Sequence, residues 1–160
     1  MMTYFKEFEV RWSDLDANRH MANSAYTNFM SHARMAFLME MGFDHKTLIE
    51  HQIGPVVFYE HMYYFREVFP GKPIKVSLEV AGMSKDGMFF EFHHNFYTAD
   101  GKNVAHCEMM GAWISLETRK LIPLKGELLE RFLGFDRADN FRILTKEDTR
   151  KFKKIPKDLV

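Results

Sequence analysis

The sequence has one cysteine, Cys107, in 160 residues. A single thiol excludes a disulfide framework within the chain and any zinc cluster held by thiolates alone. It also fits a reducing compartment, where disulfides are rare. An excess of charge of either sign is missing as well, because 22 basic residues balance 22 acidic ones. This balance removes the global electrostatic argument for binding nucleic acid or an anionic membrane.

Long apolar runs are absent too. Charged residues such as Lys6, Glu7 and Glu9 interrupt the first sixteen residues, which argues against a signal peptide. Nowhere do about 18 apolar residues follow one another, as a membrane-spanning helix requires. From these absences we expect a cytoplasmic protein with neither a membrane partner nor a nucleic-acid partner.

The chain is rich in core-forming residues, since 46% of them are hydrophobic and 16 are phenylalanine. Such a composition is typical of a folded protein, and the length allows one ordinary domain. We expect a single domain over residues 1–144 and a Lys-rich tail over residues 145–160. The tail either docks on the domain or is mobile, and its positive charge could contact the phosphates of a substrate.

The spacing of apolar residues predicts the first half of the fold. Alternation predicts a strand over residues 4–12, with Trp12 on its buried side. Apolar residues three and four positions apart predict a helix that ends at Gly42. Asn23 or Ser24 would cap its first turn.

The second half has the shorter period of strands. After a short helix or turn over residues 44–53, β-prone runs cover residues 55–69, 74–84, 88–99 and 103–117, and a short helix covers residues 126–134. Two Asp-Gly pairs separate the last three runs, and such pairs are typical of hairpins because glycine tolerates positive φ. An antiparallel arrangement follows.

This order of elements indicates an α+β fold. Because the long helix is apolar nearly all round, it needs more cover than a flat sheet gives. We therefore expect one curved antiparallel sheet wrapped around one long central helix. The open edges of such a sheet invite a second copy of the chain, so we expect a homodimer or a homotetramer.

A polar segment leads into the long helix and carries the residues best suited to chemistry. It reads D-x-D-x-x-x-H-x-x-N-x-x-Y from Asp14 to Tyr26, and Arg34 follows on the helix. Asp14 is expected to stabilise the turn, because Asp favours local hydrogen bonds there. The free amides of the helix N-terminus, near Asn23 and Ser24, could stabilise an oxyanion.

This pattern resembles that of hot-dog-fold thioesterases of the 4-hydroxybenzoyl-CoA thioesterase family. The resemblance covers about residues 4–130 and includes Tyr64-Phe65-Arg66-Glu67 and the Asp-Gly pair at 100–101. It implies a hot-dog fold and hydrolysis of an acyl thioester without a cofactor. It also implies that Asp16 acts as the nucleophile or as the general base.

A narrower similarity links the chain to the catalytic segments of plant-type acyl-ACP thioesterases, which act on acyl carrier protein. It implies that Asn18, His20 and Glu67 assist in catalysis, although each could instead brace the loop or pair with a neighbour. Three positions depart from the patterns, and one of them is Lys72, which stands where many relatives have an aspartate after the glycine. Val68 stands where a cysteine is frequent beside the glutamate, and Ala22 stands where the common motif has an asparagine.

Four further residues are candidates for binding the substrate. The amides of Asn23 and Ser24 would face the thioester carbonyl. Tyr26 belongs to the motif but also suits helix packing, and Gly111 marks either a close approach to a ligand or a bulge. The eight histidines show no H-x-x-x-H spacing and no Gly-rich nucleotide motif occurs, so we expect neither a metal nor a cofactor.

The leading interpretation of the sequence is an acyl-CoA thioesterase. An acyl-ACP thioesterase is the alternative within the same chemistry, because the thiol carrier leaves few marks in one sequence. A non-catalytic module that binds acyl thioesters is the alternative outside it.

Overall fold

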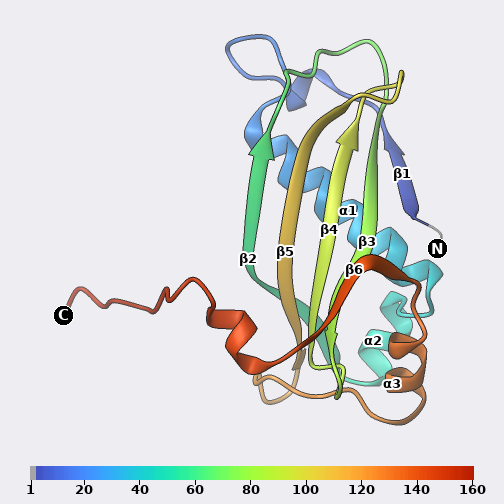
Figure 1. Ribbon diagram of the computed structural model, residues 1–160, viewed down its shortest axis with the longest axis vertical. Helices are drawn as coiled ribbons and strands as arrows, with labels where there is room; N and C mark the ends of the chain where they lie inside the picture. Colours follow the sequence, from blue (N-terminus) through green and yellow to red (C-terminus); the bar gives the residue numbers. More distant parts are fainter. Residues whose placement is uncertain (1–2) are drawn as a thin grey trace.

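The computed structural model describes residues 3–160 and contains one six-stranded sheet that curves around the long helix α1 (Figure 1). The strand order is β1-β3-β4-β5-β2, and neighbours in this order are antiparallel. The strands are β1 Tyr4–Phe8, β2 Ile53–Tyr64, β3 Ile74–Ser84, β4 Phe89–Tyr97, β5 Asn103–Ser115 and β6 Arg137–Leu144. The predicted curved sheet around one long helix is confirmed.

Helix α1 spans Asn23–Glu40, as its apolar spacing predicts. One side of it is buried against the sheet and forms the centre of the core. The buried residues are Ala25, Tyr26, Phe29, Met30, Ala33, Arg34, Phe37 and Leu38. The other side is open, and Met39 is 55% exposed. The expectation of a helix covered nearly all round is therefore wrong for the single chain, because the sheet reaches only one side.

The short elements lie where the sequence predicts them. Helix α2 spans His45–Glu50, and the carboxylate of Asp44 caps it by accepting the backbone N–H of Thr47 at 2.8 Å. Helix α3 spans Gly126–Leu133. The glycines of the two Asp-Gly pairs have φ of 70° and 84°, which glycine adopts without the strain of a Cβ. Both predicted helices and both hairpin turns are confirmed.

The first strand is shorter than predicted. It ends at Phe8, and Trp12 begins a 3₁₀ turn with 92% of its side chain exposed. The reason is Asp14, which is buried and accepts the backbone N–H of Arg11 at 2.7 Å as well as its guanidinium at 3.2 Å. These bonds turn the chain before the alternating pattern runs out, and they confirm the structural role predicted for Asp14.

Strand β6 is missing from the predicted order of elements. Its residues include Asp139 and Asn140, which are depleted in strands, and half of the eight residues are exposed. The strand pairs in parallel with β3 between Val80 and Ser84, beyond the stretch of β3 that β1 covers. The expectation of a purely antiparallel sheet is therefore wrong at this edge, where tertiary pairing overrides weak strand propensity.

Candidate active site

The loop between β1 and α1 is closed on itself by backbone hydrogen bonds. The amide of Asp16 donates to the carbonyl of His20 at 3.0 Å, and Leu15 and Met21 form an isolated bridge. Met21 also donates to the carbonyl of Val68 at 2.7 Å. This last bond joins the loop to the segment that follows β2, so residues far apart in sequence meet at one end of the sheet.

Both oxygens of the Asp16 carboxylate are held in place. One accepts the backbone N–H of Asn18 at 2.9 Å, and the other lies 3.3 Å from Nδ1 of His20. Asn18 thus contributes its backbone, while the residue as a whole is exposed. The result is a carboxylate that is partly open to solvent and fixed in direction, as a general base or nucleophile requires.

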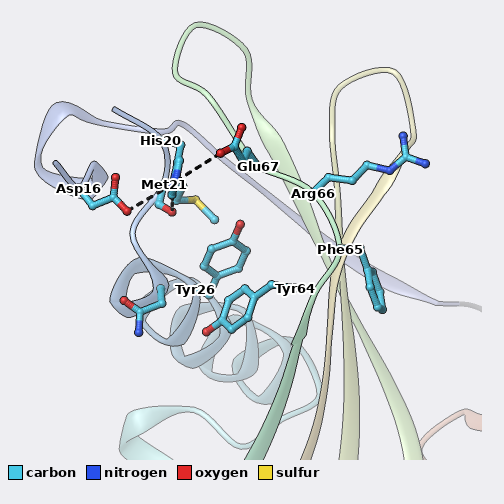
Figure 2. A pocket seen from close by; sticks show the side chains of 9 residues that line it. Asp16, His20, Met21, Tyr26, Tyr64, Phe65, Arg66 and Glu67 are labelled. Carbon is cyan, nitrogen blue, oxygen red and sulfur yellow. Dashed lines mark hydrogen bonds and ion pairs between the residues drawn. The ribbon is translucent and has the colours of Figure 1, made fainter. Parts of the chain in front are cut away.

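His20 connects Asp16 to Glu67. Its Nδ1 faces two acceptors, the Asp16 carboxylate and the carbonyl of Met21, each at 3.3 Å. This nitrogen therefore carries a proton. Its Nε2 lies 3.6 Å from the carboxylate of Glu67, which is 63% exposed (Figure 2). The imidazole and both carboxylates form one line along the upper rim of the site.

The N-terminus of α1 presents free amides to the same site. Its N-cap is Ala22, and no side chain caps the helix, so the expected caps, Asn23 and Ser24, are wrong. Ala25 donates to the carbonyl of Ala22, but within residues 3–160 the amides of Asn23 and Ser24 have no backbone or side-chain acceptor. Two unpaired N–H groups at the positive end of a helix dipole can bind a developing negative charge.

A cavity of about 350 Å³ brings these groups together. Its lining residues are Asp16, His20, Met21, Asn23, Tyr26, Tyr64, Phe65, Arg66 and Glu67. Five of the sequence-predicted site residues are among them. Asn18, Ser24 and Gly111 are not, although Ser24 lies in the first turn of the helix that borders the cavity.

Tyr26 forms the floor of the cavity together with Tyr64. Its ring packs edge-on against Tyr64, 5.1 Å between centroids, and against Phe96 at 5.0 Å. Burial raises the pKa of Tyr26 to about 12, so its hydroxyl stays protonated and can only donate or accept a hydrogen bond. The hydroxyl points toward the rim that carries Glu67 (Figure 2). Tyr26 therefore both packs in the core and lines the cavity.

Comparison with known proteins identifies the group to which this geometry belongs. The family model described as the thioesterase-like superfamily matches residues 10–132. The chain belongs to the thioesterase-like superfamily. Membership in this superfamily indicates that the chemistry of the site is thioester hydrolysis. No curated protein resembles the sequence closely enough to be matched to it.

Solved structures of similar fold agree with the superfamily. A hypothetical protein of Staphylococcus aureus in complex with CoA has a TM-score of 0.78 at 18% identity, over 98% of this chain and 96% of its own. A DHNA-CoA thioesterase of the same organism has a TM-score of 0.71 at 19% identity, over 78% and 82%. The probable thioesterase YbaW of Escherichia coli has a TM-score of 0.69 at 24% identity, over 79% and 94%. These likenesses confirm the hot-dog fold.

In this thioesterase-like chain the aromatic wall of the cavity was not predicted as part of the site. Tyr64 ends strand β2 and Phe65 and Arg66 follow it; they reach the cavity because the Met21–Val68 hydrogen bond holds the two segments together. A sequence signal exists, since two aromatic residues and a charged pair stand shortly before Pro70-Gly71. This signal indicates where a strand ends, but it does not indicate which loop packs against that end.

Within residues 3–160 no group of three or more His, Cys, Asp or Glu side chains is arranged to hold a metal ion. None of the helices described by the structure is long and apolar enough to cross a membrane.

Gly111 lies in the middle of β5, away from the cavity lining. A Cβ there would stand 2.6 Å from the backbone oxygen of Val56 and 2.8 Å from the ring of Phe90. Neither neighbour is the free end of a flexible side chain. The missing side chain therefore allows β2 and Phe90 to approach β5 closely, which is the packing alternative to a ligand contact.

Replacing Gly111 with Ala is expected to lower the free energy of unfolding by about 3 kcal/mol, because the added methyl overpacks this contact. Urea denaturation measures the loss. Gly134→Ala is the matched control, since its nearest neighbour would be 3.3 Å away and its φ of −84° suits alanine. Equal stability of the two variants would contradict this account of Gly111.

Proposed function

We propose that this protein hydrolyses an acyl-CoA thioester to a free acid and CoA, with Asp16 as general base or nucleophile. The observation that supports this most is the shared cavity of the Asp16 carboxylate and the N-terminus of α1. A group that activates water or attacks the carbonyl and donors that stabilise the resulting oxyanion are the two requirements of thioester hydrolysis.

The reaction balances with these groups alone. In the base route, Asp16 takes a proton from water as the water oxygen bonds to the thioester carbon. The carbonyl oxygen becomes an oxyanion, to which the amides of Asn23 and Ser24 donate. The C–S bond then breaks, and the thiolate leaves with the bonding electrons and takes up the proton. In the nucleophile route, an Asp16 oxygen bonds to the carbon first, and water cleaves the resulting anhydride.

His20 and Glu67 have supporting roles in this proposal. The proton on Nδ1 of His20 holds the Asp16 carboxylate, and Nε2 faces Glu67 on the solvent side of the site. A solvent-facing carboxylate beside an imidazole can orient the attacking water or accept its proton. Because thiolate is a good leaving group, with a free thiol pKa near ~8.5, no strong acid needs to protonate it.

CoA is the carrier that the comparisons favour. One solved structure of similar fold, which covers 98% of this chain, holds CoA. Arg66 extends outward at the rim of the cavity, where its guanidinium can meet a phosphate of the carrier (Figure 2). Acyl carrier protein is the alternative carrier. A module that binds acyl thioesters without turnover is the alternative function.

A panel of acyl-CoA esters with detection of released thiol tests the proposal. We expect steady release with at least one member, with Asp16 required. Tight binding of acyl-CoA without release would replace the enzyme with the binding module. Release from acyl-ACP but from no acyl-CoA would keep the chemistry and change the carrier.

We also propose that two chains associate through strand β2. This strand is 12 residues long, and within residues 3–160 it pairs only with β5 and leaves its other edge open. Exposed apolar side chains gather on and beside it; they are Val57, Phe58, Tyr63, Tyr64 and Phe65. A long open edge of this kind favours strand pairing with another chain. Light scattering at micromolar concentration is expected to give at least twice the mass of one chain, and a fully active monomer would contradict the assembly.

A further inference from the structure

The C-terminal segment crosses the outer face of the sheet, the face opposite α1. It leaves β6 at one edge, passes in front of β4 and β5, and reaches the β2 edge (Figure 1). Arg142 holds its start, because the guanidinium donates to Glu91 on β4 at 2.6 Å and to Asp148 at 2.5 Å. Thr145 and Asp148 cap the 3₁₀ helix Lys146–Arg150 that follows.

An aromatic anchor fixes the segment to the edge strand. The ring of Phe152 lies 4.2 Å from the ring of His61 and 5.2 Å from that of Tyr59, centroid to centroid, and both residues belong to β2. Nζ of Lys151 lies 5.8 Å from the Tyr59 ring. The chain is thus attached to its own sheet as far as the β2 edge and no further.

Beyond this anchor, residues 153–160 form an extended arm. Lys153 has φ of 56° and donates to the carbonyl of Arg150, which turns the chain away from the sheet. No hydrogen bond holds the rest of the arm. Ile155 is 74% exposed, and Leu159 and Val160 are fully exposed. Figure 1 shows the C-terminus pointing outward, past β2.

The outer face of the sheet carries a row of polar side chains beside the chain's own C-terminal segment. The strand register places Glu79, His93, Glu108 and His61 in one row across β3, β4, β5 and β2. Phe152 stands on the last member of this row. If a second sheet continues past the β2 edge, its outer face lies in the direction in which the arm points. Two carboxylates in that row would face the arm's lysines, Lys153, Lys154 and Lys157.

We propose that residues 153–160 of one chain lie on the outer sheet face of a second copy and join the two chains across the β2 edge. The inference rests on the proposed assembly through β2. Eight extended residues reach about 26 Å, which is enough to cross several strands spaced ~4.8 Å apart. Ile155 and Leu159 would pack on the second sheet, and the lysines would meet its Glu79 and Glu108.

Shortening the chain so that it ends at Phe152 tests the energetic role of the arm. The dissociation constant of the dimer, measured by sedimentation over a dilution series, is expected to rise at least about tenfold, since two apolar side chains lose their cover. The double change Ile155→Ser and Leu159→Ser is expected to act in the same direction. Ile49→Ser, at an exposed apolar position on α2, is the matched control and leaves the constant unchanged.

A photo-crosslinking residue at position 159 tests where the arm lies. Chains that carry it are mixed with ¹⁵N-labelled chains without it, and the mixed dimers are irradiated. Cross-linked peptides are expected to join an unlabelled arm to a labelled outer sheet face. Cross-links confined to one chain would overturn the proposal.

The outcomes separate this inference from the assembly on which it rests. If the full chain is a monomer at every concentration, the proposed assembly through β2 is wrong. The arm then has no second chain to bind, so the arm proposal is wrong as well. If the dimer persists with the same dissociation constant after truncation, only the arm proposal fails. A truncated chain with an unchanged dimer but a raised KM for acyl-CoA would place the lysines on the substrate, which also overturns it.

Discussion

Replacing Asp16 with Asn is expected to lower the single-turnover rate of thioester hydrolysis by roughly 10²–10⁴-fold. Acyl-CoA binding is expected to change little, because the amide has the size of the carboxylate and can still accept the backbone N–H of Asn18. The amide can neither take a proton from water nor attack the thioester carbon. Rapid-mixing measurements with a chromogenic thiol reagent give the rate, and a binding titration gives the affinity.

Two variants of the neighbouring residues serve as comparisons. Glu67→Gln is expected to cost less than Asp16→Asn if this exposed carboxylate only orients water. His20→Ala is expected to fall between the two, since it frees one oxygen of Asp16 from the imidazole. Each variant is checked for an intact oligomer and for thermal stability before the rates are compared.

The possible results assign the base. If Asp16→Asn keeps the parent rate and Glu67→Gln does not, the base is the glutamate that follows β2, and Asp16 braces the loop. If neither change affects the rate, the motif is structural, and the chain is better described as a module that binds acyl thioesters. A large loss of rate in the Asp16→Asn variant alone supports the proposed chemistry.

Local features of the fold could be predicted because they depend on neighbours in sequence. The stripe of α1 follows from apolar residues three and four apart, and the hairpins follow from Asp-Gly pairs. The end of β1 could not, because the alternating pattern continues to Trp12 while the Asp14 carboxylate turns the chain. Strand β6 could not either, since its pairing with β3 is its main source of order.

The same division applies to the candidate site. Asp16, His20 and Asn23 lie on one short segment, so a local motif predicts them together. The wall made by Tyr64 and Phe65 depends on a hydrogen bond between two segments about 47 residues apart, and no local pattern indicates such a contact. The missing side-chain cap at the start of α1 also depends on tertiary structure, because the geometry of the loop makes Ala22 the N-cap.

A second large effect is expected from pH, through a buried histidine that does not line the cavity. The stability of the folded chain is expected to fall as the pH drops below about 6.5, and His94 contributes to this loss. His94 is fully buried between α1 and the sheet. Its Nδ1 donates to the carbonyl of Ser77 at 2.8 Å, so its Nε2, 3.3 Å from the guanidinium of Arg34, is the acceptor.

The surroundings of His94 make a second proton on the ring unfavourable. Arg34 is positively charged and also donates to Glu60 at 2.8 Å and to Ser31 at 3.3 Å, so it is fixed in place. Cys107 faces His94 on the neighbouring strand, and burial raises the pKa of its thiol to about 12, which keeps it neutral. Burial and the charge of Arg34 therefore lower the pKa of His94 from 6.5 to about 3.

The sign of the pH effect follows from this shift. Between pH 6.5 and 3 the unfolded chain holds a proton on His94 that the folded chain does not. The free energy of unfolding therefore decreases as the pH falls, by about 1.4 kcal/mol per pH unit from this residue alone. His106, whose pKa burial also lowers, acts in the same direction.

Urea denaturation of the parent and of His94→Asn at pH 7, 6, 5 and 4 isolates the contribution. The variant can still donate to Ser77 but removes the ring nitrogen that accepts from Nη1 of Arg34, while Glu60 and Ser31 still accept from Nη2, so it is expected to be less stable at pH 7. As the pH falls, its free energy of unfolding should decrease less steeply than that of the parent. The slope should be smaller by about 1.4 kcal/mol per pH unit, which is the contribution of one proton. His45→Gln, at an exposed position on α2, is the control and keeps the parent slope. A His94→Asn variant with the parent slope would contradict the assignment, because the steepness would then come from other groups.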